Sequence, residues 1–193
     1  DCRVGENWIK TILGNFTNKK IKFVAGFVKF YSENNFLNKI QSLELISLVS
    51  SGAAAIQRKK STICNGANLA FRKKEYNDIP LDIFHDFSTD DVALLHYFKN
   101  YYKDGILFSK NLDSIVETTS NTDMISQFQQ KLRWISDSKN IRDWQSIYVA
   151  SVVFLMNLLL SILLVLTLVS IFLDFDNIYI IWINLFIVLF IKY

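Results

Sequence analysis

The sequence predicts a mixed α/β domain followed by membrane-spanning segments. Residues 1–146 alternate between patterns typical of short strands and of helices, and they hold nearly all of the charged side chains. From Trp144 to Leu173 there is no charged residue, and Ile147–Leu173 consists mostly of aliphatic residues, Phe and Met. Because a helix needs about 20 apolar residues to cross a bilayer core, we predict a transmembrane helix over 147–173.

A second apolar run, Ile178–Ile191, follows the polar segment Asp174–Asn177. It is short for a full span, so we expect a short or interfacial segment, or a span that is truncated. A buried hairpin in a soluble protein is the alternative for both runs, and the length of the first run argues against it. The chain begins without Met or a signal peptide, which leads us to expect a fragment of a longer protein.

The first half of the domain contains two helical patterns with a strand pattern between them. Glu6–Leu13 has apolar residues at helical spacing, and Lys20–Tyr31 is rich in Val, Phe and Ile, which predicts a strand or a strand pair. Phe36–Ile56 has the pattern of a long helix whose only acidic residue is Glu44. We expect this apolar helix to be buried or to contact a membrane surface.

The middle of the domain contains a loop, a strand and a helix. Small residues in Ser61–Arg72 predict a tight loop that leads into a short strand. Tyr76–Phe87 contains the single proline and is predicted to be a loop. Ser88–Lys103 is predicted to be a helix, because Ser88 can cap it and acidic residues occupy its first turn.

The end of the domain contains short strands and a final helix. Lys103–Gly105 is predicted to be a turn, and Ile106–Phe108 and Ser114–Thr118 are predicted to be strands. Asp123–Trp134 is predicted to be a helix that ends close to the first apolar run.

The charge distribution predicts which side of a membrane the domain occupies. Residues 1–146 carry a mild surplus of Lys and Arg, and Lys139 and Arg142 lie next to the predicted span. By the positive-inside rule, we expect an integral protein of the inner or plasma membrane with this domain in the cytoplasm. The basic clusters are short and balanced by acids, so we expect mostly solvated surface and no nucleic-acid partner. These clusters are Lys19-Lys20, Arg58-Lys59-Lys60 and Arg72-Lys73-Lys74.

The cysteines and histidines do not predict a metal or redox site. Cys2 and Cys64 are too few for a structural zinc site and do not form a CxxC pair, so we expect both to be reduced and buried. His85 and His96 are isolated in sequence.

The segment Gln130-Lys131-Leu132-Arg133-Trp134 combines an amide, a guanidinium and an indole beside the apolar run. On a helix Gln130, Arg133 and Trp134 are spaced i, i+3 and i+4, so they project from one side. This combination suits a site for a phosphate-bearing sugar donor at a bilayer surface. The alternative is an interfacial helix with Arg133 on lipid phosphate and Trp134 as an anchor.

Four segments occur in an order that resembles membrane-bound family-2 glycosyltransferases, the group that includes cellulose, chitin and hyaluronan synthases. Asp1-Cys2 looks like the end of a D-x-D motif, and Cys64–Arg72 resembles the loop and strand before the catalytic acid. Thr89-Asp90-Asp91 looks like the (E/D)-D motif, and Gln130–Trp134 fits Q-x-x-R-W ahead of the membrane region. The resemblance implies the C-terminal part of a GT-A domain over 1–146, followed by transmembrane helices.

The resemblance implies an inverting transferase that moves a sugar from a nucleotide-diphosphate donor to a glycan or lipid-linked acceptor. It assigns Asp91 as the general base for the acceptor hydroxyl and gives Asp90 a role in orienting the site. Acids in the first turn of a helix also complement its dipole, so capping is the alternative for both residues.

The same resemblance assigns Gln130 and Arg133 to the donor diphosphate and Trp134 to the acceptor. It assigns Asp1 as a ligand of Mg²⁺ or Mn²⁺, with an ordinary terminal residue as the alternative.

Asn65, Gly66 and Asn68 are expected to line the acceptor side, although a simple turn explains them equally well. A non-catalytic, membrane-anchored scaffold is the competing function. A transporter core is disfavoured because neither apolar run contains a charged residue.

Overall fold

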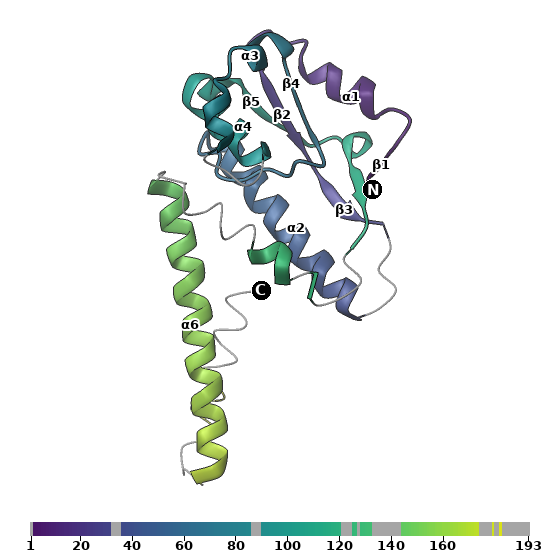
Figure 1. Cartoon of the computed structure of the whole chain (residues 1–193). Coiled ribbons are helices and arrows are strands. Elements are labelled where there is room, and N and C mark those ends of the chain that lie inside the picture. Colours follow the sequence, from purple (N-terminus) through teal and green to yellow (C-terminus); the bar gives the residue numbers. More distant parts are fainter. Residues whose placement is uncertain are drawn as a thin grey trace. The chain divides into compact units, whose positions relative to one another are not determined.

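The computed structural model describes residues 2–31, 36–85, 90–120, 125–126, 128–132, 144–173, 179 and 182. The chain divides into two units, residues 1–141 and 142–193. The first unit has a mixed α/β structure and the second contains a long helix (Figure 1). The predicted mixed α/β class is therefore confirmed, whereas the GT-A assignment stays a prediction.

One three-stranded sheet of the first unit has the strand order β1-β6-β3. Its strands are β1 (Cys2–Val4), β6 (Val116–Thr118) and β3 (Val28–Phe30). β6 pairs antiparallel with β1 and parallel with β3. The first strand thus lies beside the last one described in this unit, although more than a hundred residues separate them in sequence.

The other sheet has the order β4-β2-β5. Its strands are β4 (Leu69–Phe71), β2 (Phe23–Gly26) and β5 (Ile106–Ser109). β2 pairs antiparallel with β4 and parallel with β5, and all four of its residues are buried. Only Phe27 separates β2 from β3, so the chain passes from one sheet to the other within one residue. Lys20–Tyr31, predicted to be a strand or a strand pair, therefore contains two strands, and they belong to different sheets.

Helices cover both faces of the β4-β2-β5 sheet. Since successive side chains of a strand point to opposite faces, neighbouring residues of β2 contact different helices. Phe23 and Ala25 join the main core with residues of α2 (Phe36–Gln57) and α4 (Asp90–Tyr101). Val24 joins a smaller cluster with Ile12 of α1 (Trp8–Asn15). Figure 1 shows α1 and α4 on different sides of these strands.

The long helix α2 buries one side and exposes the other. Leu45, Val49 and Ile56 are buried in the core, whereas Leu43 and Ile46 are about half exposed. The expectation of burial is therefore met on one side of α2, and an apolar surface remains on the other.

Two local predictions are wrong. The predicted loop Tyr76–Phe87 overlaps α3 (Lys73–Asn77) and contains a 3₁₀ helix, η1 (Leu81–His85). Pro80 directly precedes η1, and its carbonyl accepts a hydrogen bond from the Ile83 N–H at 3.2 Å. The fixed φ of proline is compatible with the start of a helical turn. Cys2, expected to be buried, is exposed on the edge strand β1.

Two more segments of the first unit are 3₁₀ helices, namely η2 (Lys103–Gly105) and η3 (Leu112–Ser114). The predicted helix Asp123–Trp134 is helical at residues 125–126 and 128–132, and its other residues lie outside the described part.

The second unit contains α6 (Trp144–Leu173). Among the described helices, α6 alone is long and apolar enough to cross a membrane, over Ala150–Val169 with a mean hydropathy of 2.9. Some of its polar side chains bond within the helix: Asn157 Nδ2 donates to the Val153 carbonyl at 2.7 Å, and Thr167 Oγ1 to the Leu163 carbonyl at 2.8 Å. Such internal bonds satisfy polar groups in hydrocarbon. The predicted segment 178–191 lies outside the described residues except for Tyr179 and Trp182.

Candidate functional site

The loop between α2 and β4 is held in shape by its two asparagines. Asn65 Oδ1 accepts a hydrogen bond from the Ala67 N–H at 2.9 Å, and the Asn65 carbonyl accepts one from the Asn68 N–H at 3.1 Å. Side-chain bonds of this kind replace backbone pairing in a tight turn. The loop predicted from the small residues is therefore confirmed, and Asn65 has a role in its turn.

Asn68 is buried, with 1% of its surface exposed. Its Nδ2 donates to the carbonyls of Phe27 and Ser114, each at 2.7 Å, and its Oδ1 accepts from Trp8 Nε1 at 3.2 Å. One amide thus joins α1, the β2–β3 junction and η3 to the loop. Because both ends of this amide bind protein groups, we assign Asn68 a structural role in place of the expected contact with substrate.

Asp91 lies in the first turn of α4 and faces this loop. Its Oδ2 accepts a hydrogen bond from the Gly66 N–H at 2.7 Å, and its Oδ1 accepts one from the Val92 N–H at 2.9 Å. A Cβ on Gly66 would lie 3.1 Å from Asp91 Oδ2, which is tighter than most real contacts. Gly66 therefore permits the close approach that positions the carboxylate. Asp90 is exposed at the start of the same helix.

Cys64 also contacts Asp91, because its thiol donates a hydrogen bond to the Asp91 carbonyl at 3.5 Å. Burial raises the pKa of the Cys64 thiol well above its ordinary value, and the nearby Asp91 carboxylate adds to this effect. The thiol therefore stays protonated at neutral pH, and it is not an activated nucleophile.

A second close approach fixes the loop on α2. A Cβ on Gly52 would lie 2.8 Å from the carbonyl oxygen of Ile63. A helical glycine at this position therefore lets the loop backbone pack directly on the helix, where a larger residue would hold it away.

The predicted site residues Asn65 and Gln130 meet at a pocket of about 240 Å³. The pocket lies between α2, the ends of β3 and β6, the loop before β4, and the helical residues 128–132. Lys131 forms an ion pair with Glu44 of α2 at 2.9 Å, which joins these last residues to the helix. The lining residues are Phe30, Gln41, Glu44, Leu45, Leu48, Asn65, Ala67, Thr118, Thr119, Gln130 and Lys131.

Most of the polar lining side chains offer amide, hydroxyl or carboxylate groups, which can bind a ligand rich in hydroxyls. Sequence reasoning did not assign Gln41, Glu44, Thr118 or Thr119 to a site. Glu44 carried a signal, because it is the only acidic residue in a long apolar helix. Asp91 is not a lining residue, but it binds Gly66, the neighbour of Asn65.

Three predicted site residues, Asp1, Arg133 and Trp134, lie outside the described residues. Within the described part of the chain, no group of three or more His, Cys, Asp or Glu side chains could hold a metal ion. Because the expected ligand Asp1 is not among these residues, the site for Mg²⁺ or Mn²⁺ stays a prediction.

Comparison of the chain with protein-family models and with curated proteins finds no match. The geometry around Asp91 and the pocket at Asn65 and Gln130 therefore carry the functional inference.

Proposed function

We propose that this chain is part of a membrane-bound inverting glycosyltransferase, which moves a sugar from a nucleotide-diphosphate donor to a glycan or lipid-linked acceptor. One observation carries the proposal: Asn65 and Gln130, which belong to two of the four motif segments, line one pocket. Asp91, from a third segment, is bound to Gly66 beside that pocket. Residues from distant positions in the sequence thus lie in or beside one pocket.

The chemistry needs a base beside the acceptor. The acceptor hydroxyl attacks the anomeric carbon, the bond from that carbon to the phosphate oxygen breaks, and the nucleotide diphosphate leaves with the bonding electrons. Asp91 takes the hydroxyl proton in this scheme, because a carboxylate within hydrogen-bond reach can act as a general base. Each carboxylate oxygen has a second lone pair, so Asp91 can accept this proton while its carboxylate keeps the hydrogen bonds from the Gly66 and Val92 N–H groups.

The other predicted residues complete the scheme. Gln130 and Arg133 would hold the donor diphosphate, and Trp134 would lie near the acceptor sugar. A divalent cation would bind at Asp1 and neutralise the leaving diphosphate. We further propose that α6 anchors the enzyme in an inner or plasma membrane with residues 1–146 in the cytoplasm, which the basic residues of this domain support.

The replacement Asp91→Asn in the full-length natural protein tests the role of the base. Asparagine keeps a side-chain oxygen that can accept from the Gly66 N–H, so the loop keeps its anchor while the base is lost. We expect sugar transfer to fall by about a hundredfold or more. Transfer is measured in membrane fractions with a panel of labelled nucleotide sugars, each with Mg²⁺ and with Mn²⁺.

The exposed acid Asp113 provides the matched control, because Asp113→Asn makes the same change of charge away from the site. Near wild-type turnover by a folded Asp91→Asn protein would remove Asp91 as the base. The alternative function is a membrane-anchored scaffold, in which the Asp91 contacts would only hold the loop against the first turn of α4. If the wild-type protein transfers no sugar from any donor, the scaffold is favoured.

A further inference from the structure

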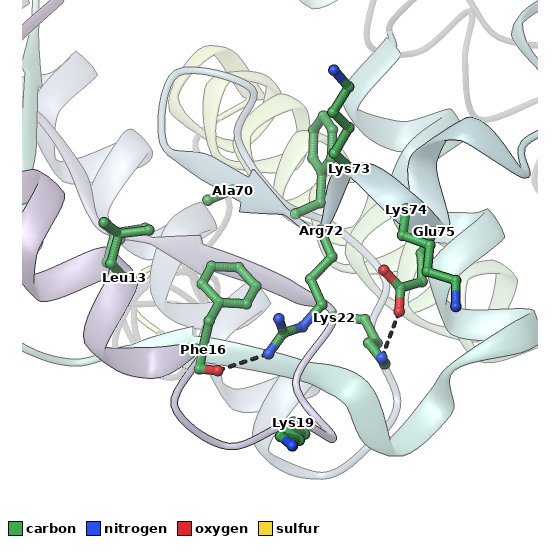
Figure 2. A pocket seen from close by; sticks show the side chains of 11 residues that line it. Leu13, Phe16, Lys19, Lys22, Ala70, Arg72, Lys73, Lys74 and Glu75 are labelled. Atoms are coloured by element: carbon green, nitrogen blue, oxygen red, sulfur yellow. Dashed lines mark hydrogen bonds and ion pairs between the residues drawn. The ribbon is translucent and has the colours of Figure 1, made fainter.

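A second pocket, of about 620 Å³, lies between α1, the segment that follows it, β4 and α3 (Figure 2). It shares no lining residue with the pocket at Asn65 and Gln130. Its lining residues are either apolar or charged. The apolar ones are Ile12, Leu13, Phe16, Ala70 and Phe71, and the charged ones are Lys19, Lys22, Arg72, Lys73, Lys74 and Glu75.

Two of the cations are held in place by the fold. Arg72 Nε donates to the Ile21 carbonyl at 2.8 Å and its Nη2 to the Phe16 carbonyl at 2.7 Å, and the guanidinium lies 5.3 Å from the Phe16 ring centroid. Lys22 forms an ion pair with Glu75, as Figure 2 shows. The pairing of β2 with β4 explains this convergence, since the Arg72 N–H donates to the Lys22 carbonyl at 3.0 Å.

Glu75 does not cancel the positive charge of the pocket. Burial opposes its ionisation, but the hydrogen bond and charge of Lys22, with the Arg72 charge, lower the pKa of Glu75 below its ordinary value. Glu75 is therefore an anion at neutral pH and is balanced by Lys22. Its Oε2 is buried, without a hydrogen-bond partner among the described residues.

The charges of Arg72, Lys19, Lys73 and Lys74 remain. The three lysines are exposed and form no ion pair with any residue in the described ranges.

An exposed apolar surface adjoins these cations. Ile9 and Leu13 of α1 are spaced i, i+4 and are 63% and 61% exposed. Leu13 also lines the pocket, so the apolar side of the helix continues into the basic pocket. A helix with exposed apolar residues beside several lysines is typical of a surface that binds anionic membranes. A soluble anion would gain no binding free energy from the exposed side chain of Ile9.

We propose that this basic pocket binds the phosphate of an anionic phospholipid headgroup, while Ile9 and Leu13 enter the lipid interface. The candidate span α6 supports lipid as the source of the phosphate, because it would keep this unit close to a bilayer. The proposal does not depend on glycosyl transfer, and it concerns a different surface of the unit.

The test compares the full chain with a triple variant, Lys19→Glu, Lys73→Glu and Lys74→Glu. These side chains are exposed, whereas Lys22 and Arg72 are kept because they hold the fold. The protein is studied in mixed micelles of a nonionic detergent with either phosphatidylcholine or phosphatidylglycerol. Amide hydrogen exchange of α1 and of β4–α3 is followed as the lipid fraction rises. The matched control makes the same charge change at three exposed lysines outside the pocket, Lys39, Lys60 and Lys110.

We expect phosphatidylglycerol, but not phosphatidylcholine, to slow exchange in α1 and β4–α3 of the wild-type and control proteins. The triple variant should need at least about a hundredfold more anionic lipid, because each lysine near an anionic surface contributes a factor of about five and each glutamate adds repulsion. Unchanged exchange in α2 and α4 would show that the variant is folded.

Equal protection of the triple and control variants would overturn the proposal, because it would indicate attraction without a site. Protection of the wild-type protein by inorganic phosphate in phosphatidylcholine micelles would also overturn it, in favour of a site for soluble phosphate.

Discussion

Replacement of Asn68 by Ala should strongly destabilise the first unit. The change removes the two hydrogen bonds from Nδ2 to the carbonyls of Phe27 and Ser114 and the one from Trp8 Nε1 to Oδ1. The Phe27 carbonyl keeps a second hydrogen bond, from the Val116 N–H at 3.0 Å. The loss of its bond to Asn68 therefore costs only about 1 kcal/mol. The buried Ser114 carbonyl and the half-buried Trp8 indole each lose their hydrogen bond to Asn68, which costs about 1–2 kcal/mol of stability each.

The expected loss is therefore about 3–5 kcal/mol, a large share of the roughly 5–15 kcal/mol that stabilises a typical domain. The measurement is equilibrium urea unfolding of the full chain in nonionic detergent, followed by circular dichroism and by amide exchange in β2. Asn77→Ala is the matched control, because Asn77 is exposed at the end of α3 and surface substitutions usually change stability by less than about 0.5 kcal/mol. If the two variants were equally stable, the proposed role of the buried amide would be refuted.

Two further predictions concern Gly52 and Glu75. Gly52→Ala should destabilise the protein in urea unfolding, although alanine usually stabilises a helix interior by about 1 kcal/mol, because its Cβ would meet a backbone carbonyl at 2.8 Å; a gain in stability would show that the loop can move away at little cost. The lowered pKa of Glu75 stabilises the folded state above the ordinary glutamate pKa of about 4.3, and this contribution is lost as the pH falls through the folded-state value. Glu75→Gln should therefore reduce stability at neutral pH and flatten its loss in acid, whereas parallel pH profiles would contradict the role of the Lys22 pair.

Elements with a strong local pattern were predictable from the sequence. α4 begins with two acids and carries an apolar stripe, and α2 has a long apolar pattern, so both lie close to their predicted bounds. η1 was missed because Pro80 was interpreted as a loop residue, whereas proline also favours the start of a helix.

Strand pairing was less predictable, because a strand's partner depends on residues far away in sequence. The pattern in Lys20–Tyr31 indicated a strand or a strand pair, but not that β2 and β3 belong to different sheets. For the same reason the clusters at Lys19 and at Arg72–Lys74 were interpreted as solvated surface. Only the register of β2 with β4 brings them to one pocket.

The candidate site was predictable where a motif named the residue type. The motifs indicated Asn65, Gln130 and Asp91, and the first two line one pocket while Asp91 binds the adjacent Gly66. Asn68 belonged to the same motif, but its burial depends on groups from three other segments, which no local pattern reveals.

The single residue between β2 and β3 affects how the first unit unfolds. The carbonyl of Phe27 accepts hydrogen bonds from both Asn68 and Val116, one from the loop before β4 and one from β6. Unfolding of either sheet would displace this shared peptide group and break its hydrogen bond on the side of the other sheet. The two sheets should therefore melt as one cooperative unit, with amide protons in β2 and β6 exchanging through a common opening event.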